Sequence, residues 1–213
     1  MKMERKDIEI TAPAGSYESL MAAIQGGADS VYFGAGQLNM RSASSINFQS
    51  DDLRKIVTVC RDNGLKSYLT VNVVIYDSEK EQMKKIIDTA KESGISAIIA
   101  SDISAIDYAF RQGIEVHLST QLNISNADAL RFYAQYGDVA VLARELNLDQ
   151  VRKIYETIKA ENIRGPKGEL IKIEMFAHGA LCMAVSGKCY LSLHENNKSA
   201  NRGTCYQTCR KSY

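Results

Sequence analysis

The chain has 213 residues, of which 45% are apolar, which is enough for one domain with a sizeable core. Its net charge of +1 excludes the overall basic character typical of duplex-binding proteins. The first residues lack the apolar segment of a signal peptide, and no apolar run approaches the roughly 20 residues that a membrane span requires. We therefore expect a cytoplasmic protein without membrane contact. In the reducing cytoplasm, cysteines more often serve metal or redox chemistry than form disulfides.

Short apolar runs of strand character recur along the whole chain. The first occupies residues 8–15, and a seventh occupies residues 171–177. Each of the five runs between them closely follows a glycine that ends an amphipathic segment, and these glycines are Gly27, Gly64, Gly94, Gly113 and Gly137. Glycine favours the left-handed conformation that ends many helices, so each position is interpreted as a helix-to-strand joint.

The segments before these glycines have helical periodicity. Within residues 53–60, and again within residues 83–90, apolar side chains fall at i, i+3, i+4 and i+7. The strand runs are apolar almost throughout, which is typical of strands covered on both faces. This alternation predicts a parallel α/β fold. A TIM-barrel-like β/α domain fits better than an open doubly wound sheet, because the units recur evenly without a reversal of strand order.

Seven strands are one fewer than a complete barrel needs, so we expect a barrel that is incomplete at its C-terminus. Residues 162–170 contain proline and glycine and are expected to form a hairpin-like loop before the seventh strand. Residues 1–181 would form the barrel-like domain. Residues 182–213, where helical periodicity disappears, would form a cysteine-rich segment of the same domain after strand seven.

Four of the five cysteines lie in this last segment, with the spacing Cys-x6-Cys-x15-Cys-x3-Cys; they are Cys182, Cys189, Cys205 and Cys209. Neighbouring thiolates repel one another unless a cation compensates them, so a shared metal centre is the economical interpretation. The wide first interval favours an iron–sulfur cluster, while zinc and unliganded or disulfide-bonded thiols remain alternatives. Cys60 lies on the apolar face of a predicted helix and is assigned to the core.

Residues 174–182 read Glu-Met-Phe-Ala-His-Gly-Ala-Leu-Cys, and residues 187–192 read Gly-Lys-Cys-Tyr-Leu-Ser. Both stretches match the signature of peptidase family U32, Glu-x-Phe-x-x-Gly-(Ser/Ala)-aliphatic-Cys followed by Gly-x-Cys-x-aliphatic-Ser. Residues 12–15, 27–32 and 201–210 resemble the same family. The resemblance extends from residue 8 to the end of the chain, whereas members of the family normally continue further.

This resemblance implies more than one possible activity. Some members are described as collagenase-like proteases. Others take part in hydroxylation of the wobble uridine of tRNA or of a cytidine in rRNA, and related proteins act in oxygen-independent hydroxylation of ubiquinone precursors. The hydroxylation proteins are linked to a 4Fe–4S cluster, and the RNA modifiers to prephenate as oxygen source. Carried over by position, the cluster ligands would be Cys182, Cys189, Cys205 and Cys209.

We therefore predict hydroxylation-type modification of an RNA base, with tRNA favoured over rRNA. A collagenase-like peptidase and a non-catalytic partner subunit of a hydroxylation complex are the alternatives. The sequence has neither a Gly-x-Ser-x-Gly elbow nor a His-Glu-x-x-His zinc motif. Cys182 with His178 is the obvious thiol–imidazole pair, but a cluster ligand cannot also serve as the nucleophile.

Active sites of β/α barrels lie at the carboxyl ends of the strands. Six polar residues near the predicted strand ends are therefore candidates: His117, Gln121, Arg144, Glu145, Glu174 and His178. Strand alternation directs His117, Ser119 and Gln121 to one side, and Arg144 could clamp the carboxylate of a small anion. Structural roles are the alternative. His117 could be a satisfied interior group, Arg144 and Glu145 a surface ion pair, and Glu174 a partner of nearby backbone.

Overall fold

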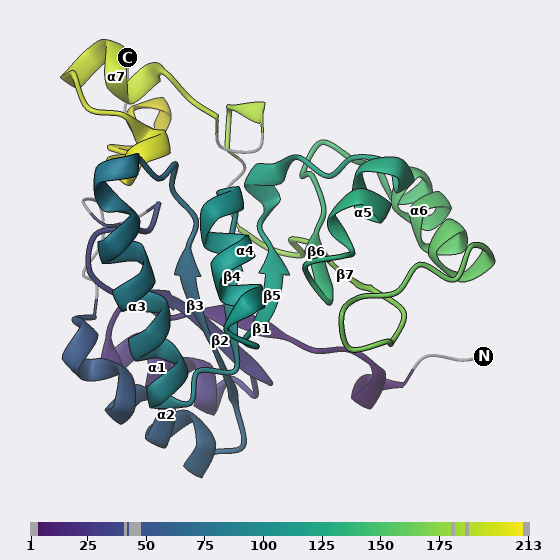
Figure 1. Cartoon of the computed structure of the whole chain (residues 1–213), viewed down its shortest axis with the longest axis horizontal. Helices are drawn as coiled ribbons and strands as arrows, with labels where there is room; N and C mark the ends of the chain where they lie inside the picture. Colours follow the sequence, from purple (N-terminus) through teal and green to yellow (C-terminus); the bar gives the residue numbers. More distant parts are fainter. Residues whose placement is uncertain (1–3, 41, 43–47, 180–181, 186–187, 211–213) are drawn as a thin grey trace.

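A computed structural model describes residues 4–40, 42, 48–179, 182–185 and 188–210. Seven strands pair in parallel in the order in which they occur in the chain. They are β1 (Thr11–Pro13), β2 (Ser30–Gly34), β3 (Lys66–Val71), β4 (Ala97–Ala100), β5 (Glu115–Leu118), β6 (Val139–Val141) and β7 (Lys172–Glu174). The sheet curls into an incomplete TIM-like barrel, as predicted (Figure 1).

Helices connect the strands and pack on the outer face of the curled sheet (Figure 1). They are α1 (Tyr17–Gln25), α2 (Leu53–Asp62), α3 (Lys80–Ser93), α4 (Ile103–Arg111), α5 (Ala127–Tyr133) and α6 (Leu148–Ala160). A further short helix, α7 (Leu191–Asn196), follows β7. Among the described residues, no helix has the length and apolar character needed to cross a membrane.

The main core fills the space between the sheet and these helices. Leu69 and Ile98 of the sheet and Ile56 and Ile87 of the helices are fully buried there. Burial of each such side chain contributes about 1.5–3 kcal/mol to folding. A much smaller apolar cluster of Tyr68, Ala97 and Ile99, with Tyr32 against it, belongs to the opposite, inner face of the sheet. Polar side chains occupy the neighbouring positions on this inner face, which is therefore a candidate binding or catalytic surface.

Two of the predicted helix-to-strand glycines illustrate different structural requirements. Gly94 ends α3 in the left-handed conformation, with φ 81°, as expected. Gly137 is the exception, because it is not among the residues with positive φ. A Cβ at Gly137 would lie only 2.8 Å from the Val116 carbonyl oxygen and 2.8 Å from Cγ of Leu118, so close packing against β5 requires glycine there.

The loop before β7 forms the predicted hairpin. Arg164 and Leu170 make an antiparallel bridge, and the Gly165 amide donates to the Glu169 carbonyl at 3.0 Å. The Lys167 amide donates to the Asp138 carboxylate at 3.0 Å, so the hairpin is fixed to the start of β6. This contact places the Lys167 side chain near the amino ends of the strands.

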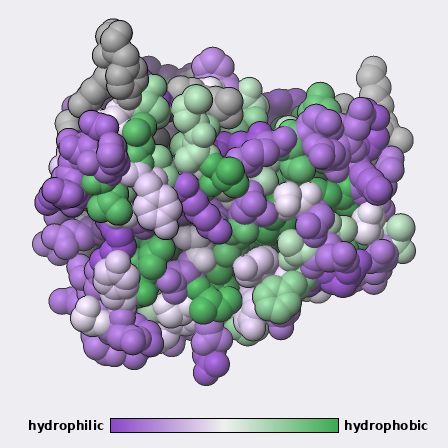
Figure 2. Space-filling view, turned by 90° about the horizontal axis from the view of Figure 1, so that it is seen from above, coloured by the Kyte–Doolittle hydropathy of each residue, from purple (hydrophilic) through white to green (hydrophobic). Residues whose placement is uncertain are grey.

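The segment beyond β7 returns over the carboxyl ends of β2 and β3, at the upper left of Figure 1. The Val74 amide donates to the Asn201 carbonyl at 3.2 Å, and the Ser42 hydroxyl donates to the Gly203 carbonyl at 3.3 Å. Viewed from above, apolar and hydrophilic side chains are interspersed over this face (Figure 2). The cysteine-bearing segment thus packs directly on the strand-end loops.

Candidate functional site

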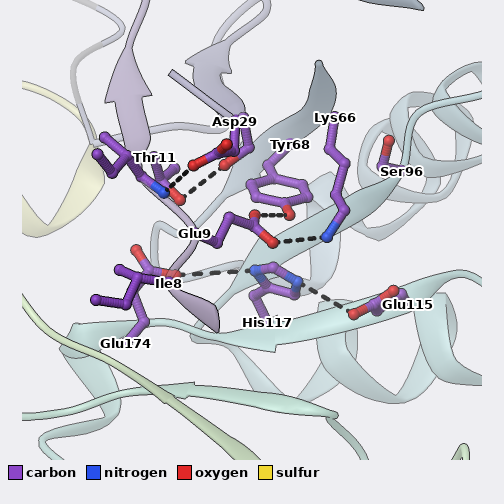
Figure 3. Close-up of polar contacts among 12 residues, drawn as sticks. Ile8, Glu9, Thr11, Asp29, Lys66, Tyr68, Ser96, Glu115, His117 and Glu174 are labelled. Atoms are coloured by element: carbon purple, nitrogen blue, oxygen red, sulfur yellow. Dashed lines mark hydrogen bonds and ion pairs between the residues drawn. The ribbon is translucent and has the colours of Figure 1, made fainter. Parts of the chain in front are cut away.

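A charged network begins at the amino ends of β1 and β3 (Figure 3). Glu9 accepts from the Lys66 ammonium at 2.6 Å and also from the Tyr68 hydroxyl. Burial opposes ionisation of Glu9, but these hydrogen bonds outweigh it and lower its pKa. Burial, together with the neighbouring Glu9 carboxylate, raises the pKa of Tyr68 and keeps its hydroxyl a donor. Glu9 is therefore a satisfied anion.

His117 lies at the centre of the inner face. Only 3% of its surface is exposed, and its ring packs against Tyr68 with centroids 4.4 Å apart. The ring nitrogen Nε2 lies 3.3 Å from Oε1 of Glu115, which also pairs with Lys167. The hydrogen bond from His117 lowers the pKa of Glu115 to about 2, with Lys167 contributing further and burial opposing the shift. Glu115 is thus a carboxylate that orients the imidazole.

The other ring nitrogen, Nδ1, points toward Glu174 at the end of β7 (Figure 3). Nδ1 lies 3.9 Å from Oε2 of Glu174, beyond direct hydrogen-bond distance. Burial raises the pKa of Glu174, only partly offset by His117, and the Glu9 carboxylate raises it further. Two residues predicted from the sequence, His117 and Glu174, are therefore brought together across β5 and β7.

Two other candidates lie at the rim of the barrel. Gln121 accepts from the Ser101 hydroxyl at 3.3 Å, and the Arg144 guanidinium lies over the Phe176 ring, 5.7 Å from its centroid. The expected alternation through Gln121 is wrong beyond Leu118, because β5 ends there. Ser119 instead caps a short 3-10 helix (Thr120–Leu122) by accepting from the Gln121 amide, so Gln121 reaches the rim from a turn.

The remaining candidates are separate from this inner network. Glu145 is exposed in the turn after β6, and His178 is exposed in a bend after β7. The contacts described for His117 are instead to Glu115, Glu174 and Tyr68. The signature residues Ala180, Leu181, Ser186 and Gly187 lie outside the described residues.

Sequence reasoning missed the partners that fix His117. Glu9, Lys66, Tyr68, Glu115 and Lys167 were not predicted as site residues. A local signal existed for only some of them. Lys66 and Tyr68 are two positions apart on β3, and Glu115 and His117 are two positions apart on β5, so each pair lies on one side of its strand. Their pairing with Glu9 and Lys167 depends on segments that are distant in the sequence and is set by the strand register.

The four cysteines of the C-terminal segment have free thiols that are neither buried nor fully exposed. The Cys189 amide donates to the Asn201 side chain at 3.2 Å, and the Leu191 amide donates to the Cys189 sulfur at 3.3 Å. Four thiols match an iron–sulfur cluster in kind and number. Their described arrangement does not form such a site, since no three His, Cys, Asp or Glu side chains among the described residues gather closely enough to hold a metal ion.

The fold and this constellation define a β/α-barrel protein with a polar inner face and a cysteine-rich segment over its strand ends. The model of peptidase family U32 matches residues 15–213, and the chain belongs to that family.

Three curated relatives illustrate its range. The chain is 67% identical to a protein named collagenase from Porphyromonas gingivalis, over 99% of its own length. It is 35% identical to the 23S rRNA 5-hydroxycytidine C2501 synthase of Escherichia coli over 100% of its length, and 34% identical to tRNA hydroxylation protein P1 of Bacillus subtilis over 98%. The chain spans only 51%, 31% and 47% of these relatives, respectively.

Among solved structures, the chain resembles that of the U32 peptidase Mk0906, with a TM-score of 0.60 at 13% identity. The likeness covers 78% of this chain and 66% of that one. At this identity it supports the barrel fold alone.

Proposed function

We propose that this chain forms part of a protein that takes part in hydroxylation-type modification of an RNA base, with the tRNA wobble uridine as the favoured substrate. The carrying observation is that the chain aligns over 98% of its length with a tRNA hydroxylation protein and over 100% with an rRNA cytidine-modifying synthase. Since it spans about a third to a half of these relatives, the activity is proposed for the whole protein to which the chain belongs.

The rim of the barrel is the proposed binding place for a small carboxylate such as prephenate. Arg144 lies there with its guanidinium over Phe176, and the amide of Gln121 lies beside the Ser101 hydroxyl. A guanidinium can bind a carboxylate through two parallel hydrogen bonds, and the amide and hydroxyl can orient the remaining polar groups of the ligand.

The four cysteines of the C-terminal segment are the proposed ligands of a 4Fe–4S cluster, with zinc as the alternative. The N–H group of Leu191 already donates to the sulfur of Cys189, as outer-shell groups do for cluster sulfurs. A bound cluster would supply electron transfer. Because the described thiols are not gathered around one centre, they would have to approach one another on loading. Because a cluster requires reduced thiols, we propose that the protein is located in the reducing cytoplasm.

The test combines a cellular and a chemical measurement. Deleting the gene for the whole protein should remove one hydroxylated nucleoside from total RNA, measured by mass spectrometry of tRNA and rRNA fractions. Anaerobically purified whole protein should contain about four iron and four sulfide per chain, both lost in Cys205→Ala but retained in the control Cys60→Ala. Unchanged RNA in the deletion strain would rule out the modification, and zinc or metal-free protein would rule out the cluster.

A collagenase-like peptidase is the second candidate, favoured by the relative at 67% identity. Within the described ranges, however, His117 and His194 lie beside the carboxylates of Glu115, Glu174 and Glu195, whereas an activated nucleophile would require a Ser, Thr or Cys side chain bonded to a histidine. Release of peptides from denatured collagen by metal-free protein, abolished in Cys182→Ala, would support this candidate over RNA modification.

A further inference from the structure

His117 carries a buried polar atom without a partner. Its side chain is 4% exposed, yet among the described residues Nδ1 has no hydrogen bond. An unsatisfied buried acceptor or donor costs about 1–3 kcal/mol, so such an atom requires an explanation. Nδ1 is aimed at Glu174, whose side chain is 28% exposed, so the space between them borders a residue that reaches the solvent (Figure 3).

The opposite side of the imidazole fixes its tautomer. Glu115 is held as a carboxylate by His117 and Lys167, and a carboxylate only accepts hydrogen bonds. The nitrogen facing it, Nε2, must therefore carry the proton. In the neutral imidazole this leaves the lone pair on Nδ1, directed toward Glu174. Glu115 and Lys167 act as positioning residues, since they orient the ring without facing the space beside Nδ1.

The charges around the ring select the kind of group that can enter this space. Glu9 is already paired with Lys66 and Tyr68, and Glu115 with Lys167. Glu174 and Nδ1 are left facing each other at 3.9 Å. An oxygen atom about 2.8 Å from each atom fits that separation with normal hydrogen-bond lengths. An anion would add a further negative charge beside Glu174, whereas a neutral hydroxyl adds none.

We propose that His117 Nδ1 and the Glu174 carboxyl group form a binding site for a neutral hydroxyl oxygen, either water or the alcohol group of a small ligand. The hydroxyl donates to Nδ1 and accepts from protonated Glu174; water, which has a second proton, can instead donate to both Nδ1 and the Glu174 carboxylate. Nδ1 thereby becomes the proton acceptor for whatever hydroxyl is bound. This site lies on the inner face and is distinct from the carboxylate site proposed at Arg144 on the rim.

The first test is the tautomer of His117, measured by long-range proton–nitrogen NMR on ¹⁵N-labelled protein. The sequence has three histidines, and His117→Gln identifies the relevant signals. Wild type should show protonated Nε2 and unprotonated Nδ1, and Glu115→Gln should give a mixture of tautomers. Lys167→Met, which keeps the Glu115 carboxylate, should change the tautomer less. Protonated Nδ1 in neutral wild-type imidazole, or an unaltered tautomer in Glu115→Gln, would overturn the assignment.

The second test concerns the oxygen itself. A crystal structure of the wild-type protein should show an ordered water within about 3.2 Å of both Nδ1 and Glu174. Methanol, the smallest alcohol, should shift the Nδ1 resonance in wild type but not in Glu174→Ala. A direct Glu174–His117 hydrogen bond with no oxygen between them, or no methanol response, would contradict the site. Neither test depends on RNA modification or iron content, so failure here and failure of the proposed function are distinguishable.

Discussion

Nη1 of Arg202 lies 2.8 Å from Oε2 of Glu79, and this ion pair joins two segments that are 123 residues apart. The same guanidinium donates to the Val74 carbonyl and lies over the Tyr76 ring, 3.9 Å from its centroid. Both partners of the pair are more than three-quarters buried, at 23% and 22% side-chain exposure. The pair therefore fastens the cysteine segment to the loop after β3.

Replacing Arg202 should loosen this attachment. Arg202→Ala leaves Glu79 without its cationic partner and removes the contact with the Tyr76 ring, which we expect to lower the free energy of unfolding by about 2 kcal/mol. Arg202→Lys keeps the charge but loses the bidentate geometry, so its stability should lie between those of wild type and Arg202→Ala. Urea unfolding measures the change, and Arg210→Ala, at an exposed position, is the control. Equal stability of Arg202→Ala and wild type would show that the pair does not hold the segment.

Glu115 should make stability depend on acid pH. Its pKa falls from 4.5 to about 2 in the folded protein, so its contribution is fully present above pH 4.5 and is lost as the pH falls toward 2. This difference corresponds to about 3 kcal/mol at most. In Glu115→Gln the free energy of unfolding should be lower at neutral pH and should change less between pH 5 and 3. Exposed Glu81→Gln should retain the wild-type profile, and an unchanged profile in Glu115→Gln would contradict the paired carboxylate.

Glu174 should make stability depend on pH in the opposite direction from Glu115. Burial raises its pKa above 4.5, so the folded state is favoured while Glu174 is protonated and loses that advantage as the pH rises through the folded value. Glu174→Gln removes the charge at similar volume. We expect it to be more stable than wild type at pH 7, with a smaller difference at pH 4. Thermal unfolding of both proteins at the two pH values measures this difference. A stability gain over wild type that is smaller at pH 7 than at pH 4 would refute the prediction.

The thiols should divide into two classes. Cys60 is 1% exposed, and burial raises its pKa to about 11, so it should react with a thiol reagent only after unfolding. The four cysteines of the C-terminal segment are partly exposed and should react quickly in reduced, metal-free protein. The absorbance of released thionitrobenzoate gives the count. Five fast thiols would mean that α2 does not pack as described, and Cys60→Ala should abolish only the slow phase.

The order of the elements was predictable because its causes are local. Helical periodicity, terminal glycines and continuous apolar strands each depend on a few adjacent residues, and together they predicted seven parallel units. Gly137 shows the limit of this reasoning. Its requirement arises from the approach of Val116 and Leu118 on the preceding strand, and nothing in the neighbouring sequence distinguishes it from a left-handed glycine such as Gly94.

The candidate site was predictable only in part for the same reason. His117 and Glu174 follow from their positions on two predicted strands near the barrel mouth. The Glu115 carboxylate beside His117 is paired with Lys167, which reaches it from a hairpin 52 residues away. Lys66 and Glu9 are 57 residues apart. Such pairs are set by strand register and loop geometry, and no spacing rule in a single sequence encodes them.

The strand order has a consequence for how the chain acquires its structure. Each strand pairs with its predecessor, so the sheet can grow one unit at a time as the polypeptide is synthesised, and few distant contacts are needed early. The Arg202–Val74 hydrogen bond, which closes a separation of 128 residues, forms only after β3 and the whole later chain exist. The cysteine segment can thus dock only after the strands beneath it have been synthesised.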